Sequence, residues 1–298
     1  MRYYFAPMEG VTDSVYRRLH HAFFGGVDCY YMPFFSPTVH RTLTHKEDRE
    51  LPPADSVPFA AVPQIMTKVA EDFLWAAEQC AQRGYKEVNL NLGCPSGTVV
   101  AKGKGAGLLR DLSGLEAFLD GIFASSPLPV SLKTRLGLEQ PEEFLALLEL
   151  YNRYPARELI IHPRTRKQFY AGDLHMEMFR YAQENSQIPL CFNGEIHTKA
   201  EADGCPVASV MIGRGLLADP GMLTDAGTSP EQLEKFHDAL LEEYTLVFGG
   251  VRNAMFRLKE NWHYWEQRFD SDGKLFKRLR KSTDVGEYRG IVAEIFHT

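Results

Sequence analysis

The fold is decided by a stretch that reads EVNLNLGCP at residues 87–95. It begins as a short run of the kind that predicts a buried strand. It ends in Asn91, Gly93 and Cys94, where polar or conformationally permissive residues replace the apolar ones. This arrangement is typical of α/β folds, in which functional side chains gather at the carboxyl ends of parallel strands.

Seven further runs have the same character, and amphipathic stretches such as 68–85 and 141–154 lie between them. The second of these stretches starts with Pro141 and two glutamates, which is typical of a helix start. The other predicted strands are 3–7, 28–34, 59–65, 129–135, 158–164, 189–195 and 209–215, besides 87–93. Eight strands that alternate with helices predict either a TIM barrel or a doubly wound open sheet.

The ends of the predicted strands favour the barrel. Polar residues and glycines close several different strands, at 7–9, 64, 91–94, 133–135, 162–164, 193–195 and 213–215. An open sheet would concentrate such residues at one switch point, whereas a barrel spreads them over many strand ends. The sequence therefore predicts a (β/α)8 TIM barrel.

A second domain is predicted beyond the barrel. Residues 225–232, DAGTSPEQ, have the composition of a linker, and no strand pattern follows them. The remaining residues are aromatic, rich in lysine and arginine, and helical in pattern. We therefore expect a barrel domain over 1–228 and an all-helical domain over 232–298.

Composition excludes several classes of protein. No run of about 18 apolar residues is present, and MRYYFAPMEG at the start lacks the apolar core of a secretory signal. Five cysteines without CxxC spacing argue against a disulfide framework or a zinc site. We therefore expect a cytoplasmic protein with no membrane span and no metal.

The net charge of −6 disfavours a nucleic-acid partner at first sight, but the charge is unevenly distributed. From residue 232 to the end, 11 Lys and Arg balance 11 Asp and Glu, so the whole deficit lies in the first 231 residues. Residues 274–281, KLFKRLRK, carry five basic side chains and no acidic one. The C-terminal region can therefore offer an RNA surface, with a solvated helix face as the alternative.

Two glycine turns, 193–195 and 213–215, close the seventh and eighth predicted strands. Glycine lets backbone N–H groups approach a phosphate, and neither turn matches a dinucleotide pattern, so a mononucleotide such as FMN fits best. The alternative is a pair of tight turns. Lys133 is expected to point into the barrel mouth, where an anionic reduced flavin would balance its charge; the alternative is a surface lysine.

Four other strand-end residues are candidates for the site. Gln64 and Asn91 carry amides that suit the uracil-like edge of a flavin or of a uracil base. His162 follows two isoleucines and is equally well explained as a core histidine. Cys94 precedes a glycine-rich segment, 96–109, which is expected to be a mobile, solvent-facing loop. A thiol with a pKa near ~8.5 is mostly protonated at neutral pH and can act as a general acid.

Taken together, these residues resemble the tRNA-dihydrouridine synthase family. The GCP segment and the HPRTRKQFYAG segment are the most specific. The matching segments are APMEGVTDSVYRR (6–18), VPQIM (62–66), NLNLGCPSGTVVAKGKGAGLL (89–109), LKTRLG (132–137), IHPRTRKQFYAGD (161–173), FNGEI (192–196) and IGRGLLADP (212–220).

The resemblance implies a flavoenzyme that binds FMN, is reduced by NADPH, and reduces the C5–C6 double bond of a uridine in the D-loop of tRNA. A monomer is expected. Cys94 would protonate C5, and Asn91 would hold the target base. Contacts with the flavin are implied for Pro7, Met8, Glu9, Gln64, Lys133, His162, Asn193, Gly194, Glu195, Gly213 and Arg214. Contacts with the RNA are implied for Arg164, Arg166, Lys167 and Tyr170.

The resemblance also places RNA contacts in the C-terminal region. In residues 251–265, Arg252, Phe256, Lys259 and His263 recur at spacings of four, three and four, which puts them on one helical face. Arg252 and Lys259 are therefore expected to bind RNA phosphates. The alternative is that Phe256 belongs to a core and that the charges only solvate the helix.

Two departures from the family pattern stand out. Asn89 replaces an acidic residue, and Leu174–His175 stand where a tryptophan is common; neither is expected to touch the chemistry. Two other functions compete with the implied one. The first is an FMN-dependent barrel reductase of a free small molecule, similar to dihydroorotate dehydrogenase. The second is an RNA-binding barrel without catalysis, which the presence of both Cys94 and Lys133 disfavours.

Overall fold

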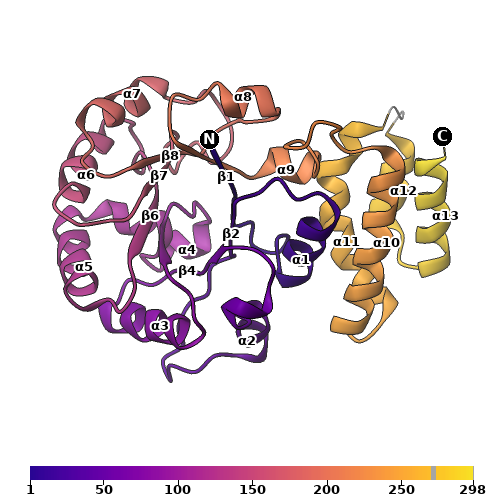
Figure 1. Ribbon diagram of the computed structural model, residues 1–298, viewed down its shortest axis with the longest axis horizontal. Helices are drawn as coiled ribbons and strands as arrows, with labels where there is room; N and C mark the ends of the chain where they lie inside the picture. The colour runs from indigo at the N-terminus through magenta and orange to yellow at the C-terminus, as the bar shows by residue number, and fades with distance from the viewer. Residues whose placement is uncertain (270–272, 298) are drawn as a thin grey trace. The chain divides into compact units, whose positions relative to one another are not determined.

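The computed structural model describes residues 1–269 and 273–297, and its strands form one parallel sheet (Figure 1). Each predicted strand is present, so the strand prediction is confirmed. The strands are β1 Arg2–Phe5, β2 Cys29–Tyr31, β3 Ala61–Val62, β4 Gln64–Ile65, β5 Val88–Leu92, β6 Val130–Arg135, β7 Leu159–His162, β8 Leu190–Phe192 and β9 Ser209–Ile212.

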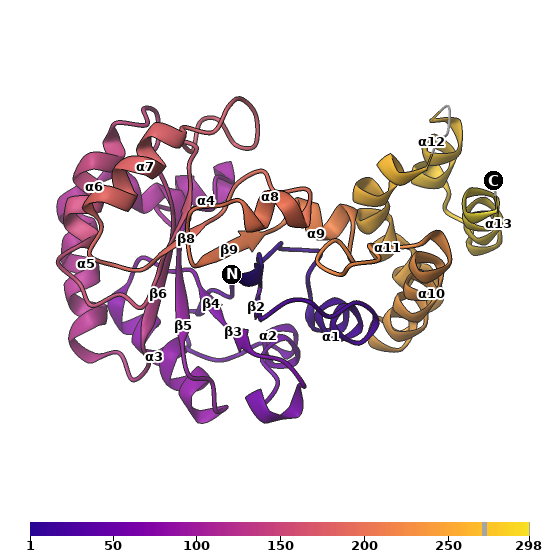
Figure 2. The ribbon, with the colours of Figure 1, turned by 45° about the horizontal axis from the view of Figure 1, so that its top comes forward.

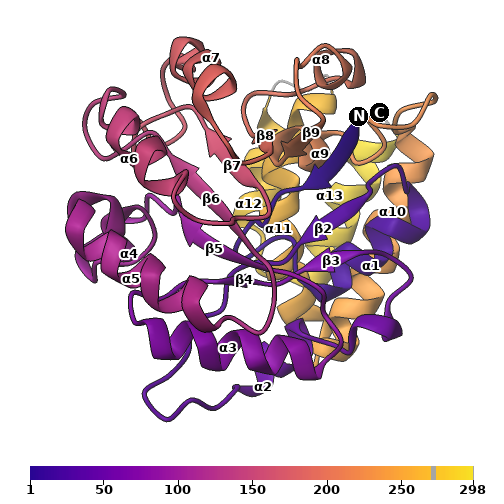
Figure 3. The same cartoon turned by 60° about the vertical axis from the view of Figure 1, so that its left-hand side comes forward.

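The sheet closes through a strand that Pro63 divides in two. β3 pairs with β2, β4 pairs with β5, and the sheet runs in the order β3-β2-β1-β9-β8-β7-β6-β5-β4. Proline has no N–H to donate, while its carbonyl still accepts from the N–H of Asn89 at 2.9 Å. Counted as one strand, β3 and β4 complete an eight-stranded ring (Figure 3). The predicted (β/α)8 barrel is confirmed.

Helices follow most strands and cover the ring with apolar faces. On α3, Phe73, Ala76, Ala77 and Cys80 are buried, so the helix predicted over 68–85 is present, and so is the one predicted over 141–154. The helices up to α7 are α1 Ser14–Phe23, α2 His45–Glu50, α3 Ala70–Gln82, α4 Gly97–Ala101, α5 Leu112–Ser125, α6 Glu143–Tyr151 and α7 Met176–Asn185, with short 3-10 helices η1 Ala54–Ser56 and η2 Gly105–Arg110.

The later helices form most of a second group. α10 starts at Pro230 with Ser229 as its N-cap, and Asp284 caps α13. Trp262 and Trp265 of α11 are buried and pack edge to face at 5.3 Å. Figure 2 shows α11 beside α10. The helices are α8 Lys199–Asp203, α9 Arg214–Ala218, α10 Pro230–Val247, α11 Val251–Trp265, α12 Lys274–Lys281 and α13 Val285–Phe296, with the 3-10 helix η3 Glu266–Arg268.

The chain divides into two compact units whose boundaries interleave along the sequence. The barrel unit comprises 1–7, 28–195 and 204–212, and the helical unit comprises 8–27, 196–203 and 213–298. All strands belong to the barrel unit, while α1, α8 and α9 group with the C-terminal helices. The domain limits predicted from sequence, 1–228 and 232–298, stay a prediction.

Inside the ring, a layer of mostly apolar side chains precedes the polar side chains at the carboxyl ends of the strands. Tyr4, Tyr31, Ile160, Cys191 and Met211 belong to one buried cluster, and the rings of Tyr4 and Tyr31 lie 5.4 Å apart. Two residues after Ile160 and Cys191, on the same side of their strands, the polar residues His162 and Asn193 follow. The carboxyl ends of the strands are therefore where chemistry can be placed.

The prediction of a mobile, solvent-facing loop over residues 96–109 is wrong, because these residues do not form an open loop. It forms α4 and η2, and Gly105, Ala106, Gly107 and Leu109 are buried. A Cβ on Gly105, whose φ is +56°, would lie 2.9 Å from Cβ of Cys94, and one on Gly107 would lie 2.8 Å from the carbonyl oxygen of Val100. These two glycines serve close packing beside Cys94.

No helix in the described ranges is long and apolar enough to span a bilayer. Over the same residues, no group of three or more His, Cys, Asp or Glu side chains is arranged to hold a metal ion. The five cysteines are thiols.

Candidate active site

A buried amide network lies across β4, β5 and β6. Gln64 donates from Nε2 to Oδ1 of Asn89 at 2.8 Å and accepts at Oε1 from Nδ2 of Asn91 at 2.7 Å. Asn89 donates in turn to the hydroxyl of Ser131 at 2.9 Å. Asn89, which is not expected to touch the chemistry, hydrogen-bonds directly to Gln64 and so orients its amide, and the expectation about the chemistry stays a prediction. Ser131 was not singled out from sequence.

The same network fixes the backbone at Cys94. Oδ1 of Asn91 accepts from the N–H of Gly93 at 3.0 Å and from the N–H of Cys94 at 2.9 Å. The carbonyl of Cys94 accepts from the N–H of Ala106 at 3.1 Å. Cys94 is half-buried. The predicted general acid is therefore held by its backbone on both sides, with its side chain partly accessible.

Lys133 lies beside Asn91 in the β5–β6 register and reaches across the barrel interior. Its Nζ donates to Oδ1 of Asn193 at 2.6 Å, and Nδ2 of Asn193 donates to the carbonyl of Met211 at 2.8 Å. Burial, and secondarily the charge of Arg135, lowers the pKa of Lys133 to about 8. An ammonium whose partner is a neutral amide would gain from an anionic ligand.

Arg135 is a site residue that sequence reasoning missed. It is 2% exposed, at the end of β6 and two residues after Lys133. Its Nε donates to the carbonyl of Gly93 at 2.9 Å, and its NH1 donates to the carbonyls of Thr165 at 3.0 Å and Phe169 at 2.6 Å. Burial lowers its pKa to about 10. Arg135 ties the backbone beside Cys94 to the segment 165–172, and strand alternation from Lys133 could have identified it.

Arg164 holds the same segment from the other side. Its NH2 and Nε donate to the carbonyl of Gly172 at 2.8 and 3.1 Å, and its NH1 donates to Oε1 of Glu195 at 2.7 Å. NH1 also lies 3.2 Å from Nε2 of the buried His162. Because Arg164 is 4% exposed, these contacts favour a positioning role over the RNA contact predicted for it.

The segment 165–172 itself carries the other predicted RNA residues. Arg166 donates to the carbonyl of Pro95 at 3.2 Å and lies 5.2 Å from the ring of Phe169. Lys167 is exposed and pairs with Glu139 at 2.9 Å. Tyr170 is 46% exposed, and its ring lies 6.0 Å from that of His162. Arg166, Lys167 and Tyr170 thus remain near the surface, close in sequence to the residues that frame Cys94.

Gly194 is required by packing. A Cβ there would lie 2.4 Å from the ring of Phe192 and 2.9 Å from the side chain of Leu174. Leu174, which is not expected to touch the chemistry, packs beside Gly194, and the expectation about the chemistry stays a prediction. The glycine turn after β8 therefore has a structural cause, and its predicted phosphate contact stays a prediction.

The remaining predicted flavin residues follow β1 and β9. Pro7 belongs to the barrel unit, whereas Met8, Glu9, Gly213 and Arg214 belong to the helical unit. The carbonyl of Met8 accepts from the N–H groups of Val11 and Thr12, which closes a turn. Gly213 precedes α9, and its carbonyl accepts from the N–H of Leu217. Their contacts with a cofactor stay predictions.

The donor set of the barrel unit fits an isoalloxazine ring. Gln64 and Asn193 offer amides, and Lys133 offers a donor whose charge the neutral Asn193 leaves unbalanced. The ring of a reduced flavin presents both amide-like edges and a negative charge, so it matches these groups in kind. We therefore find the residues compatible with a bound flavin.

In the helical unit, Arg252 and Lys259 differ in their surroundings. The guanidinium of Arg252 lies 5.8 Å from the ring of Phe256, which is 43% exposed and not part of a core. Nζ of Lys259 lies 5.0 Å from the same ring and donates to the carbonyls of Ser282 and Arg280, at the end of α12. Burial lowers the pKa of Lys259. Lys259 thus supports a helix end, and Arg252 remains the better candidate for RNA.

Comparison with known proteins agrees with this geometry. A family model described as dihydrouridine synthase matches residues 4–284. A tRNA-dihydrouridine(16) synthase from Shigella flexneri is 30% identical over 310 residues, which cover 94% of each chain. One from Vibrio vulnificus is 28% identical over 316 residues, covering 100% of this chain and 97% of that one.

A solved structure shares the fold alone. The old yellow enzyme homologue from Zymomonas mobilis superposes with a TM-score of 0.51 at 10% identity, covering 78% of this chain and 88% of that one. The match of the family model over almost the whole chain, on a barrel whose carboxyl end presents Cys94 and Lys133, shows that the chain belongs to the dihydrouridine synthase family of flavin-dependent oxidoreductases.

Proposed function

We propose that this protein is a tRNA-dihydrouridine synthase that uses FMN and NADPH to reduce a uridine in the D-loop of tRNA. The observation that carries the proposal is the pairing of Asn91 with Lys133 in the β5–β6 register, which puts the residue that fixes Cys94 beside a half-buried amine. The relatives from Shigella flexneri and Vibrio vulnificus are named for position 16 of tRNA. Uridine 16 is therefore the proposed target.

Each residue has a separate task in this proposal. Bound FMN would supply the redox chemistry, the transfer of a hydride from NADPH to C6 of the uracil. Lys133 would hold the flavin through its charge, and Gln64 through its amide. Cys94 donates a proton to C5, which completes the addition of two hydrogens across the double bond.

Asn91 has few hydrogen-bonding groups left for the target base. Its Oδ1 accepts two backbone N–H groups, and one of its amide protons goes to Gln64. One N–H donor is therefore left for a uracil carbonyl. In this proposal Asn91 positions both partners of the proton transfer, the thiol through the backbone and the base through its amide.

RNA must be gripped well beyond the target base, because that base has to leave its stack. Because the first 231 residues carry the whole net negative charge, we assign RNA binding in the barrel only to the local group Arg166, Lys167 and Tyr170, together with Arg252 in the helical unit. We further propose a cytoplasmic monomer, with residues 1–228 as the catalytic domain and 232–298 as the tRNA-binding domain.

The test is to map dihydrouridine in tRNA from cells with and without the gene. Dihydrouridine should disappear at position 16 in the deletion strain. The purified, yellow protein should then restore it in a transcript that carries uridine at position 16 but not in one that carries cytidine there. An unchanged dihydrouridine map, together with NADPH oxidation driven by a free enone or orotate, would favour the small-molecule reductase instead.

A further inference from the structure

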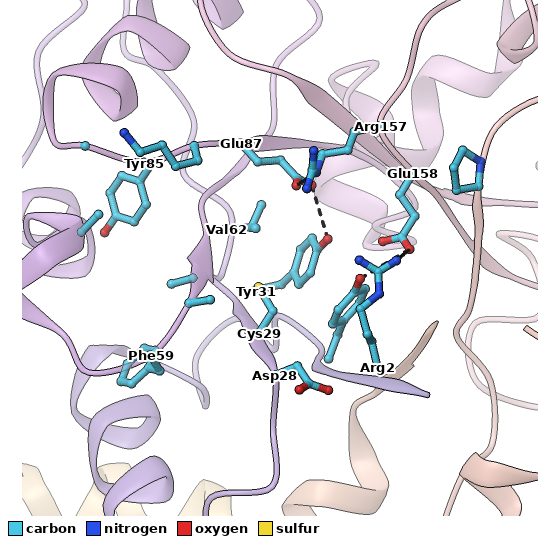
Figure 4. Close-up of a pocket in the computed structure, with 17 residues that line it drawn as sticks. Arg2, Asp28, Cys29, Tyr31, Phe59, Val62, Tyr85, Glu87, Arg157 and Glu158 are labelled. Atoms are coloured by element: carbon cyan, nitrogen blue, oxygen red, sulfur yellow. Dashed lines mark hydrogen bonds and ion pairs between the residues drawn. The ribbon is translucent and has the colours of Figure 1, made fainter. Parts of the chain in front are cut away.

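The charges that line the cavity at the amino end of the barrel balance one another. The lining includes three basic and three acidic side chains: Arg2, Lys86, Arg157, Asp28, Glu87 and Glu158. Figure 4 shows Arg2 beside Glu158 and Arg157 beside Glu87, and each of these contacts is an ion pair. A feature without such an explanation lies at the carboxyl end of the strands, in the segment 165–172.

This segment presents two aromatic rings to solvent. Among the barrel residues that the structure describes, Phe169 and Tyr170 are the two exposed phenylalanine, tyrosine or tryptophan residues, at 41% and 46%. Tyr170 is already a predicted RNA contact, whereas Phe169 has no assigned role. A single exposed apolar side chain is common on protein surfaces and needs no explanation by itself. Phe169 needs one because of its backbone.

The backbone of Phe169 lies in the left-handed region, with a φ of +51°. Glycine, asparagine and aspartate tolerate this region, but a bulky residue is an outlier there because its Cβ crowds the backbone. Hydrogen bonds hold the conformation. The N–H of Phe169 donates to the carbonyl of Arg166 at 3.1 Å, and its carbonyl accepts from NH1 of the buried Arg135 at 2.6 Å.

The strain at Phe169 is not offset by burial of its ring, since 41% of the residue is exposed. An asparagine would fit the same turn at a lower conformational cost. Residues held in such unfavourable conformations cluster at functional sites, where the side chain is needed for binding or catalysis. The aromatic ring of Phe169 is therefore the part of the residue that requires an explanation.

The surroundings of the ring place it beside the proposed general acid. Nε of Arg166 donates to the carbonyl of Pro95 at 3.2 Å, and Nε of Arg135 donates to the carbonyl of Gly93 at 2.9 Å, so the segment is tied to the backbone on both sides of Cys94. The guanidinium carbon of Arg166 lies 5.2 Å from the centre of the Phe169 ring. The segment thus combines an exposed aromatic face with a cation.

An unpaired nucleobase matches this combination. Bases in RNA loops are bound by stacking on aromatic rings, and a nearby arginine attracts the phosphate backbone. When the target base leaves its stack, the base next to it loses one stacking partner. An aromatic ring beside the reaction site can take the place of that partner.

We propose that Phe169 stacks on the unpaired base next to the target uridine, with Arg166 at the adjoining phosphate. This inference rests on the proposed function, because it requires RNA at the mouth of the barrel. It adds a base-binding residue to that function, and Phe169 takes no part in the transfer of the hydride or the proton.

The affinity of the holoenzyme for a tRNA transcript, together with the thermal stability of each variant, tests the proposal. Phe169→Asn should bind the transcript about ten- to hundred-fold more weakly, the usual loss for one stacking contact. Its melting temperature should equal or exceed that of the wild type, because asparagine tolerates the left-handed backbone. Leu145→Asn, at a residue of α6 that is 39% exposed, is the matched control and should bind as wild type.

Two further variants separate the ring from its bulk. Phe169→Leu keeps an apolar side chain and the backbone strain but offers no aromatic face, so it should lose affinity as Phe169→Asn does. Phe169→Trp should retain the wild-type affinity. Wild-type binding by the leucine variant, or a lower melting temperature of Phe169→Asn with unchanged binding, would overturn the proposal in favour of a structural role.

A thermodynamic cycle identifies the base. The nucleotide on each side of the target uridine is replaced in turn by an abasic one. One of these transcripts should bind wild-type enzyme as weakly as intact tRNA binds Phe169→Asn, and the variant should lose no further affinity for it. Independent losses with both transcripts would overturn the stacking contact alone if wild-type enzyme still forms dihydrouridine. A wild-type enzyme that forms none in tRNA would overturn the proposed function as well.

Discussion

The two ends of the barrel hold their cationic side chains in opposite ways. At the carboxyl end, the ammonium of Lys133 is bound by an amide and the guanidinium of Arg135 by three carbonyls. At the amino end, Arg2 and Arg157 are each paired with a carboxylate. A cation whose hydrogen-bond partners are neutral can still attract an anionic ligand. The charge of a cation in an ion pair is already balanced by its carboxylate. The contrast supports the proposal that an anionic cofactor binds at the carboxyl end.

The largest effect is expected when the proposed general acid at the carboxyl end, Cys94, is removed. Cys94→Ala should keep the flavin and its reduction by NADPH, because no substrate proton is needed for that half-reaction. Reoxidation by tRNA should fall by roughly 10²–10⁴-fold, the usual loss for a general acid. Stopped-flow absorbance of the flavin follows both half-reactions separately.

Cys205→Ala is the control for Cys94, because Cys205 is also partly accessible but lies before β9. It should reoxidise at the wild-type rate. Full turnover on tRNA by the Cys94 variant would remove this thiol from the mechanism.

Lys133→Met should lose most of the flavin, since the methionine fills the space of the lysine without offering a charge.

The stability of the apoprotein gives a second measurement of the role of Lys133. The folded pKa of Lys133 is about 8, below its ordinary 10.5, so the folded state releases a proton that the unfolded state retains between these values. The free energy of unfolding of wild-type apoprotein, relative to Lys133→Met, should therefore rise from pH 8 to about 10.5.

In the holoprotein this rise should shrink, because an anionic ring edge would restore the pKa of the ammonium. Urea unfolding at pH 7.5 and 9.5, with and without FMN, measures both effects. If the free energy of unfolding has the same pH dependence with and without FMN, the flavin does not contact Lys133.

Arg135→Lys tests whether the missed arginine acts by position. Lysine keeps the charge but cannot bind three carbonyls in a fixed fork. We expect faster hydrogen exchange in residues 165–172 and about ten- to hundred-fold slower reoxidation by tRNA, since small misplacements near reacting groups are costly. Arg153→Lys, at an exposed ion pair, should change neither quantity.

The same distinction between engaged and available cations applies in the helical unit. Arg252→Ala should weaken tRNA binding and reduce its salt dependence by up to about one unit of slope. Lys259→Ala should instead lower the thermal stability of the helical unit, because its ammonium binds the carbonyls at the end of α12. If Lys259→Ala changes the salt slope and Arg252→Ala does not, the two roles are reversed.

The smallest effect is expected at the amino end. Arg157→Gln removes the more exposed partner of an ion pair and should cost less than about 1 kcal/mol of stability. Flavin content and tRNA turnover should stay at the wild-type level. A loss of flavin in this variant would mean that the two ends are coupled and that the comparison fails.

The strands could be predicted because each ends where apolar residues give way to glycines or polar side chains, as at Gly93. The division of the third strand at Pro63 could not, since a single run at 59–65 gives no sign that its halves pair with different neighbours. Closure of the ring depends on this long-range pairing, which no local pattern contains.

Within the site, Cys94 and Lys133 could be identified from the sequence because their residue types are unusual at strand ends. Strand alternation from Lys133 could also have identified Arg135, whereas the role of Asn89 could not be predicted, because it lies in contacts across strands. Segment 96–109 was mistaken for a loop because its glycines suggested mobility. Gly105 and Gly107 are instead small so that α4 and η2 can pack beside Cys94.

The contacts of the amide network determine which atom of each side chain donates and which accepts. The N–H groups of Gly93 and Cys94 can only donate, so the oxygen of Asn91 must face them and its nitrogen must face Gln64. This orientation forces that of Gln64, which forces that of Asn89, and the sequence of donors runs one way to Ser131. No amide can flip alone without setting two donors or two acceptors against each other. An aspartate in place of Asn89 would reverse only the last step, with the Ser131 hydroxyl turning to donate, so the network can gain a negative charge while Cys94 keeps its orientation.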